Sequence, residues 1–123
     1  MDFIKKEDIV TLDSDFQVSH QLLWNENSNS KRITITKVHV YPEKTNQRHK
    51  HESSEQIWIA LKGRGTLLLN DDKTLEINEG DVVRFADGET HGITNNSDEE
   101  FIYISITSPP INFRYAYKGE KKN

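Results

Sequence analysis

Short stretches of alternating side chains, each ended by a turn signal, constrain the fold of this 123-residue chain more than any other feature. In "RITITKVHVY" (32–41), isoleucines alternate with threonines, which is the period-two pattern of a β-strand. Pro42 follows, and proline ends a strand or confines it to a sheet edge because it has no N–H to donate. No helical periodicity lasts for three turns. The sequence therefore predicts an all-β protein.

Other segments repeat this pattern at regular spacing. A glycine-rich turn (63–65) and the polar turn "NDDK" (70–73) separate neighbouring segments, and Pro109-Pro110 stops the last long one. Several short strands joined by turns indicate a sandwich or a barrel. The expected strands cover residues 18–24, 32–41, 56–62, 66–70, 74–77, 82–85, 91–94 and 99–106.

The length fits one domain, 1–123, in which 1–17 form an N-terminal segment and 108–123 form a C-terminal arm or tail. The aromatic stretch "NFRYAY" (112–117) is expected to form a strand or an arm across a partner. Hydrophobic residues make up only 33% of the chain, so the core must be concentrated on a few strand faces or extended by a partner. A homo-oligomer is therefore one expectation.

Composition excludes several functions. The net charge is -4 and no basic block is longer than the tail "KGEKKN", so nucleic-acid binding has no support. The chain has no cysteine, which excludes disulfides and thiolate metal sites. The first residues lack the long apolar stretch of a secretion signal or a membrane span, so we expect a cytoplasmic protein that does not bind membranes.

The stretch "NQRHKHESSEQIWIALKGRG" (46–65) carries the first candidate metal ligands. Residues two apart in an extended segment face the same way, so His49 and His51 can present their imidazoles side by side. Glu55 opens the next expected strand, and a carboxylate on an apolar face must be paired or metal-bound. The alternative to a metal site is that His49 and His51 are solvated turn residues and that Glu55 is an acidic surface residue. His91 is either a fourth ligand or a structural histidine.

The alternation also predicts which side chains point outward. If Ile57, Ile59 and Leu61 share the inward face with Glu55, then Trp58 faces out. If the isoleucines of 99–106 fill the core, Phe101 and Tyr103 also face out. Exposed aromatic side chains favour a buried partner surface. The alternative is a bulge that reverses one strand, which would make Tyr103 a pocket residue.

Four other residues have chemistry worth following. Arg84 and Arg114 are each either a clamp for a substrate carboxylate or phosphate, or a solvated arginine. His20 and His39 lie outside the histidine-rich stretches, and we expect them to be structural.

A second stretch, "EGDVVRFADGETHGITNN" (79–96), contains His91. Together with residues 46–65, it resembles the cupin family, and in particular its small single-domain microbial members. The first cupin motif, Gly-x5-His-x-His-x3,4-Glu-x6-Gly, is matched at His49, His51 and Glu55, with Gly63 one residue late and Glu43 in place of the first glycine. The second motif, Gly-x5-Pro-x-Gly-x2-His-x3-Asn, keeps all its spacings and is matched at Gly80, Gly88, His91 and Asn95, with Ala86 in place of proline. All three departures lie in turns and leave the candidate metal ligands unchanged.

The resemblance implies a small antiparallel jelly-roll barrel with one divalent transition metal, held by His49, His51, Glu55 and His91. Mn and Fe are favoured, and Ni, Co and Zn also suit the same nitrogen and oxygen donors. Glu55, together with a metal-bound water, is the candidate for proton transfer. The resemblance implies two partners, a small-molecule substrate or ligand and a second copy of the chain, since small cupins resemble one another in forming homodimers.

Three functions fit such a site. The first is a metalloenzyme of the dioxygenase, isomerase or lyase type that acts on a small, oxygen-rich organic molecule. The second is a non-catalytic module that binds or senses a small ligand. The third is a barrel in which the metal only stabilises the fold. Fold alone does not decide among them.

Overall fold

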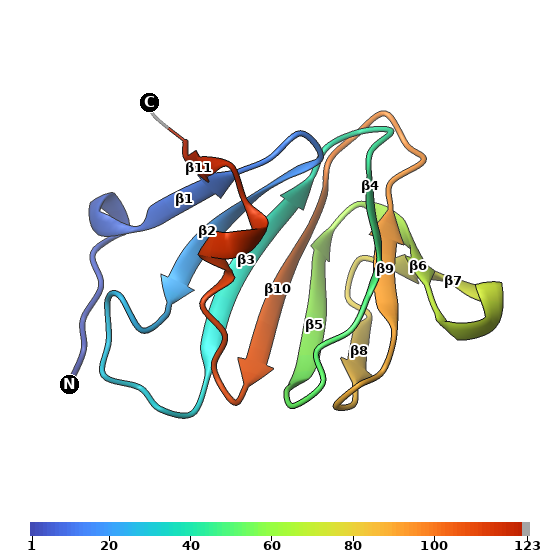
Figure 1. The fold of residues 1–123 in the computed structure, drawn as a ribbon. Helices are drawn as coiled ribbons and strands as arrows, with labels where there is room; N and C mark the ends of the chain where they lie inside the picture. The colour runs from blue at the N-terminus through green and yellow to red at the C-terminus, as the bar shows by residue number, and fades with distance from the viewer. Residues whose placement is uncertain (122–123) are drawn as a thin grey trace.

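The computed structural model describes residues 1–121 as two antiparallel β-sheets packed against each other (Figure 1). The larger sheet has seven strands in the order β11-β1-β2-β3-β10-β5-β8, and the smaller has four in the order β4-β9-β6-β7. The strands are β1 (Val10–Asp13), β2 (Gln17–Leu23), β3 (Thr34–Val40), β4 (Thr45–His49), β5 (Glu55–Lys62), β6 (Arg64–Leu68), β7 (Thr74–Asn78), β8 (Val82–Phe85), β9 (His91–Thr94), β10 (Phe101–Ser108) and β11 (Gly119–Glu120).

Three 3-10 turns complete the elements of residues 1–121, namely η1 (Lys6–Asp8), η2 (Asn70–Asp72) and η3 (Phe113–Ala116). Within those residues no helix is both long enough and apolar enough to cross a membrane. The predictions of an all-β fold and of a small antiparallel jelly roll are confirmed.

Three strands lie where the sequence predicted none. β4, with the sequence "TNQRH", has no apolar alternation, yet it pairs with β9. β1 lies inside the expected N-terminal segment 1–17 and pairs with β2. β11 lies inside the expected arm 108–123 and pairs with β1 through Leu12 and Glu120. The C-terminal segment therefore folds back onto its own barrel (Figure 1).

The predicted inward face of β5 and β10 is wrong. Trp58 is 2% exposed and lies inside the barrel, whereas Ile57 and Ile59 are only partly buried on the outer face. On β10, Phe101 and Tyr103 are buried inside. They belong to one aromatic and aliphatic core cluster, which comprises Val38, Val40, Trp58, Ala60, Leu67, Ile77, Phe85, Ile93, Phe101 and Tyr103.

The reason lies in the polar interior of the larger sheet. A sheet with one solvated face shows apolar side chains inward and polar ones outward. Here polar side chains are buried beside the core cluster, and isoleucines occupy the outer face instead, so the alternation suggested the opposite orientation. The buried polar side chains of this sheet are Gln17, Ser19, Gln21, Thr34, Thr36, Gln56, Ser105 and Thr107.

Candidate metal centre

Three of the four predicted ligands meet inside the barrel. One nitrogen from each of His49, His51 and His91 lies within 4.8 Å of the others, so the group can hold a metal ion. The ring centroids of His49 and His91 are 4.5 Å apart, and that of His51 lies 5.2 and 5.3 Å from them. His49 ends β4 and His91 begins β9, and the two residues are paired in the sheet register.

Two glycines close to His91 in the sequence hold this arrangement in place. Gly92 follows His91, and a Cβ there would lie 2.9 Å from the backbone nitrogen of Arg48 and 2.8 Å from a carbonyl of β4. A larger residue would therefore push β4 away from β9. Gly88 has a φ of +72°, and its N–H donates to the carbonyl of His51 at 2.8 Å. The turn before His91 thus fixes the backbone of His51.

Hydrogen bonds orient two of the imidazoles for metal binding. His49 Nδ1 lies 2.7 Å from the carbonyl of Gln47, and His91 Nδ1 lies 3.2 Å from the carbonyl of Glu89. A carbonyl can only accept, so each Nδ1 carries the proton and each Nε2 keeps a free lone pair. His91 Nε2 is buried without a hydrogen-bond partner within residues 1–121. A buried nitrogen of this kind suits a metal ligand.

Burial favours the neutral form of His51 and His91. Burial, and secondarily the nearby His49, lowers the pKa of His91 to about 3. The same two causes lower the pKa of His51 from its ordinary value. Only a neutral imidazole can bind a metal, so the site is ready to do so at neutral pH.

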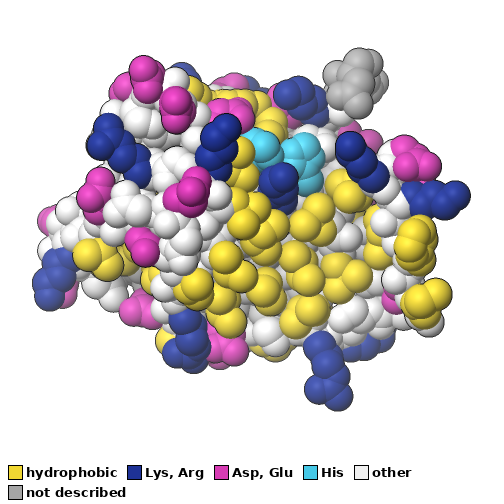
Figure 2. All heavy atoms as spheres, turned by 180° about the vertical axis from the view of Figure 1, so that it is seen from behind, with side chains coloured by type: hydrophobic (Ala, Val, Ile, Leu, Met, Phe, Trp, Pro, Cys, Tyr) yellow, Lys and Arg dark blue, Asp and Glu magenta, His cyan; other side chains and the backbone are white. Residues whose placement is uncertain are grey.

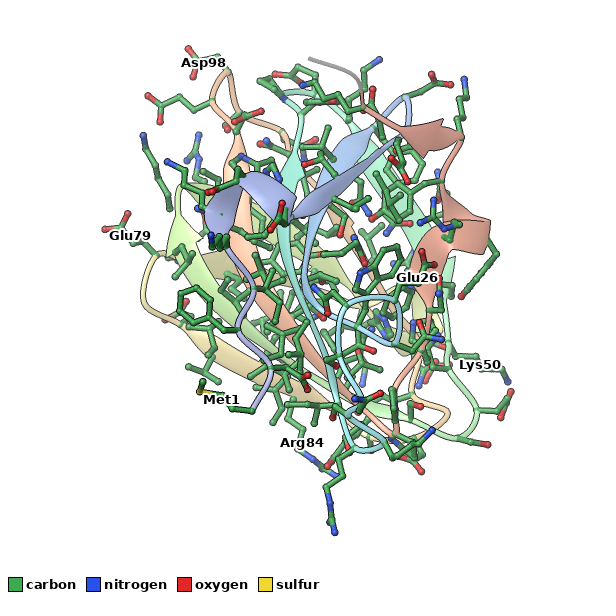
Figure 3. All side chains as sticks on the ribbon, turned by 90° about the vertical axis from the view of Figure 1, so that its left-hand side faces the viewer. Met1, Glu26, Lys50, Glu79, Arg84 and Asp98 are labelled. Carbon is green, nitrogen blue, oxygen red and sulfur yellow. The ribbon has the colours of Figure 1, made fainter. Side chains whose placement is uncertain are left out.

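The structure does not bring Glu55 to the three histidines. Because the orientation of β5 is reversed, Glu55 lies on the outer side, where its carboxylate accepts a hydrogen bond from Arg84 Nε at 2.6 Å. Arg84 lies at the lower end of the barrel (Figure 3). The two side chains form a surface ion pair in which Arg84 is 60% exposed, so Arg84 is a solvated arginine and does not line the cavity as a clamp.

Gln56 takes the inward position next to Glu55, and the sequence interpretation missed it. Gln56 is 5% exposed and lines the same cavity as His49 and His51. Its amide donates to Thr107 Oγ1 at 3.0 Å, and its Oε1 accepts from Trp58 Nε1 at 3.1 Å. The signal was present in the spacing. The first motif allows four residues between its second histidine and its glutamate, and it requires six between that glutamate and the glycine. Gln56 has both spacings, with four residues after His51 and six before Gly63.

A cavity of about 340 Å³ extends from the histidines between the sheets. Trp58 and Tyr103, which stack with ring centroids 4.2 Å apart, form part of its wall. Phe113 of η3 covers the histidine end and lies 5.7 Å from the ring of His51. Tyr103 is therefore a pocket residue, although no single bulge causes this. Within residues 1–121, no Asp or Glu side chain lines this cavity.

Arg114 anchors the segment that covers the cavity. It donates to the carboxylate of Glu26 at 2.6 and 3.0 Å, pairs with Glu120 at 3.2 Å, and lies 5.0 Å above the ring of Trp24. Figure 3 shows Glu26 beside the C-terminal segment. Arg114 thus binds protein groups and does not face the cavity as a substrate clamp.

His20 and His39 lie apart from the metal centre. His20 hydrogen-bonds to Thr11 at 2.8 Å, and His39 to Glu100 at 3.1 Å. Their rings form an edge-to-face pair 5.1 Å apart. These contacts agree with the structural role expected for both histidines.

Comparison with known proteins supports the same family as the motifs. The Cupin domain family profile matches residues 36–107, more than half of the chain. An oxalate-binding protein of Thermotoga maritima is 33% identical over 87 residues, which cover 69% of this chain and 71% of that protein. The chain spans only 15% and 49% of the lengths of two other curated relatives that it matches.

Solved structures share the fold at lower identity. The ectoine synthase of P. lautus superimposes with a TM-score of 0.79 at 15% identity and covers 98% of this chain and 88% of its own. The polyketide cyclase RemF of Streptomyces resistomycificus gives a TM-score of 0.76 at 20% identity, with 88% and 79% covered. With the family profile over both motifs, and with the three histidines in one cluster, this chain belongs to the cupin family.

Proposed function

We propose that this chain is a metal-dependent enzyme of the dioxygenase, isomerase or lyase type that acts on a small, oxygen-rich organic molecule. The observation that carries the proposal is His91 Nε2, which is buried without a partner beside two further imidazoles at the end of a cavity of about 340 Å³. Such a site suits one divalent transition metal, with Mn or Fe favoured. Gln56 is the proposed fourth ligand in place of Glu55.

The metal would supply Lewis-acid stabilisation of negative charge on substrate oxygens and, if it is iron, reactivity toward O₂. The chain itself supplies a closed, partly aromatic cavity. Burial raises the pKa of Tyr103 well above its ordinary value, so this phenol stays protonated. Because Tyr103 lines the cavity, it can donate a hydrogen bond to an oxygen of the substrate.

A second candidate is a non-catalytic module that binds a small ligand. It is favoured by the lack of a carboxylate among the described residues that line the cavity, which removes the usual acid or base. The relative named as an oxalate-binding protein points the same way. Both candidates need the same metal, so they differ only in turnover.

Metal analysis and a turnover assay test the proposal together. We expect close to one transition metal per chain after purification without chelators. The metal-loaded protein is then incubated with oxalate and with a panel of small hydroxy and keto acids, with and without O₂, and followed by NMR. Conversion that stops when the metal is removed supports the enzyme, and its dependence on O₂ identifies the dioxygenase type. Binding of oxalate without conversion of any compound supports the second candidate. A protein that takes up no metal contradicts both.

We also propose a homodimer, but through a different surface from the one that the sequence suggested. On the outer faces of β3, β10, β5 and β8, side chains that are paired in the strand registers line up in two rows that run across the four strands. Figure 2 shows the hydrophobic patch on this side of the molecule. The apolar members of the patch are Ile35, Ile57, Ile59, Leu61, Val82, Ile102, Ile104 and Ile106.

A second copy is the occupant that fits this patch. Four strands at roughly 4.8 Å spacing, with between two and four outward positions on each, cover about 400 Å². That is about half of the ~800 Å² that each partner buries in a standard interface, and a polar rim supplies the remainder. A two-fold axis places identical isoleucine rows face to face, so each copy covers the other.

Changing Ile104 to glutamate is expected to separate the copies. Ile104 lies between Ile59 and Lys37 in the patch. Even if Lys37 pairs with the new carboxylate, burying two charges between the copies costs several kcal/mol of desolvation that the isoleucine does not. Light scattering on a sizing column should give twice the chain mass for the wild type and one chain mass for I104E. Leu75→Glu is the matched control, since Leu75 is 58% exposed on the smaller sheet, and it should remain a dimer. A wild type of one chain mass contradicts the dimer.

A further inference from the structure

The cavity has a second polar end, away from the histidines. β2 contributes Gln17 and Ser19, and the C-terminal segment contributes Tyr117. β2 lies three strands from β5, which carries Gln56, in the order β2-β3-β10-β5. Three spacings amount to roughly 14 Å across the strands. The strand registers also place Gln17 level with Phe101 of β10, whereas Gln56 is level with a position six residues farther along that strand, roughly 20 Å away. The two ends of the cavity therefore lie more than roughly 14 Å apart at the backbone, and the side chains reach inward from both ends.

Gln17 presents an unused acceptor at this end. It is 5% exposed, and its Nε2 donates to the hydroxyl of Tyr117 at 2.8 Å. Its Oε1 is buried and has no hydrogen-bond partner within residues 1–121. A buried amide oxygen without a partner costs free energy, and a side chain that lines a cavity can recover it from a ligand.

The neighbours of Gln17 occupy its amide nitrogen. Burial raises the pKa of Tyr117, while hydrogen bonds with Ser19 and Gln17 oppose that rise, so the phenol stays protonated. Ser19 in turn accepts from Gln21 Nε2 at 2.8 Å. The amide of Gln17 is thus tied through its nitrogen to a network inside the barrel, which leaves its oxygen for the ligand.

The charge of the cavity restricts what can bind to that oxygen. An ammonium group would need a carboxylate nearby, and none of the described cavity-lining residues supplies one. A neutral donor, either a hydroxyl or an amide N–H, needs only the acceptor that Gln17 offers. The aromatic walls of Trp58 and Tyr103 suit the apolar middle of such a ligand.

We propose that Gln17 forms a second binding subsite that accepts a hydrogen bond from a neutral hydroxyl or amide N–H of the ligand, at the opposite end from its metal-chelating oxygens. The ligand class is therefore an elongated molecule with two ends, in which a chelating oxygen group and a neutral donor are joined by a largely apolar link. This inference rests on the proposed metal site, because that site fixes the other end of the ligand.

Alkyl hydroxamates of increasing length are suitable probes, since the hydroxamate chelates metals and the tail can be varied. One series ends in a hydroxyl and the other in the corresponding methyl ether, which can only accept. Calorimetry on the metal-loaded wild type should show that, at the best length, the hydroxyl probe binds about three- to tenfold more tightly than its ether. Gln17→Met should abolish this preference.

Gln21→Met is the matched control. Gln21 also has a buried Oε1 without a partner within residues 1–121, but it does not line the cavity, so Q21M should keep the preference for the hydroxyl probe. Equal binding of hydroxyl and ether probes to the wild type overturns the subsite, as does a preference that survives in Q17M. Tighter binding of the ether contradicts the donor class. If even acetohydroxamate fails to bind, the metal site fails and the subsite fails with it.

Discussion

The His91→Ala protein is expected to lose metal binding. His91 supplies the most deeply buried of the three imidazoles, and its Nε2 has no other partner in the described chain. Changes to partners of metal ligands alone typically weaken affinity 10- to 100-fold, so removal of a ligand should weaken it by at least about 100-fold. Metal content and competition with a chromogenic chelator measure the effect.

The neighbouring pair Glu55 and Gln56 gives the sharper control. Glu55→Gln should retain the metal, because that carboxylate is bonded to Arg84 on the outer side. Gln56→Ala should weaken binding by about tenfold or more, since Gln56 shares the cavity with the histidines. If E55Q loses the metal and Q56A keeps it, the motif assignment made from the sequence is right and the assignment made from the structure is wrong. His91→Leu, which fills the space with a side chain that has no donor atom, distinguishes lost coordination from the cavity that alanine leaves in the barrel.

The sequence predicted the fold class because alternation and turn signals are local, whereas it predicted the cluster of three histidines only through the resemblance to the two cupin motifs. Alternation, turn glycines and the spacing of the second motif each depend on a few neighbouring residues. β4 was missed because its five residues carry no apolar pattern, and it is a strand only because β9 pairs with it. Pairing of that kind depends on residues about 45 positions apart, which alternation cannot report.

The orientation of β5 could not be read from alternation for a physical reason. Both parities of the strand "EQIWIALK" contain large apolar side chains, and the polar Gln56 belongs to the inward set. Hydrophobicity therefore favoured an inward orientation of the isoleucines. In the structure the barrel buries Trp58, and the isoleucines lie on the outer patch. The residue count back from Gly63 was the better guide, since glycine at a φ of +81° fixes the turn that ends the strand.

This orientation has a large effect on stability that can be measured directly. Trp58 is 2% exposed, and its ring stacks on Tyr103 at 4.2 Å and meets Phe85 edge-on at 5.0 Å. Its Nε1 also donates to Gln56. Trp58→Ala is expected to lower the free energy of unfolding by about 3–5 kcal/mol, as tryptophan truncations in packed cores do. Urea unfolding measures this change.

Ile59→Ala supplies the comparison on the same strand, because its side chain lies on the opposite face. Both variants should be made in the I104E background, so that loss of contacts between copies does not enter the difference. In that background, Ile59→Ala should lower the free energy of unfolding by about 1 kcal/mol, since it removes a partly exposed side chain and leaves no closed cavity. Trp58→Phe remains informative if the alanine variant fails to fold, and it should cost less than W58A because it keeps a ring in the core. If Ile59→Ala proved more costly than either Trp58 variant, the strand would have to face the other way, and Glu55 would return to the metal site.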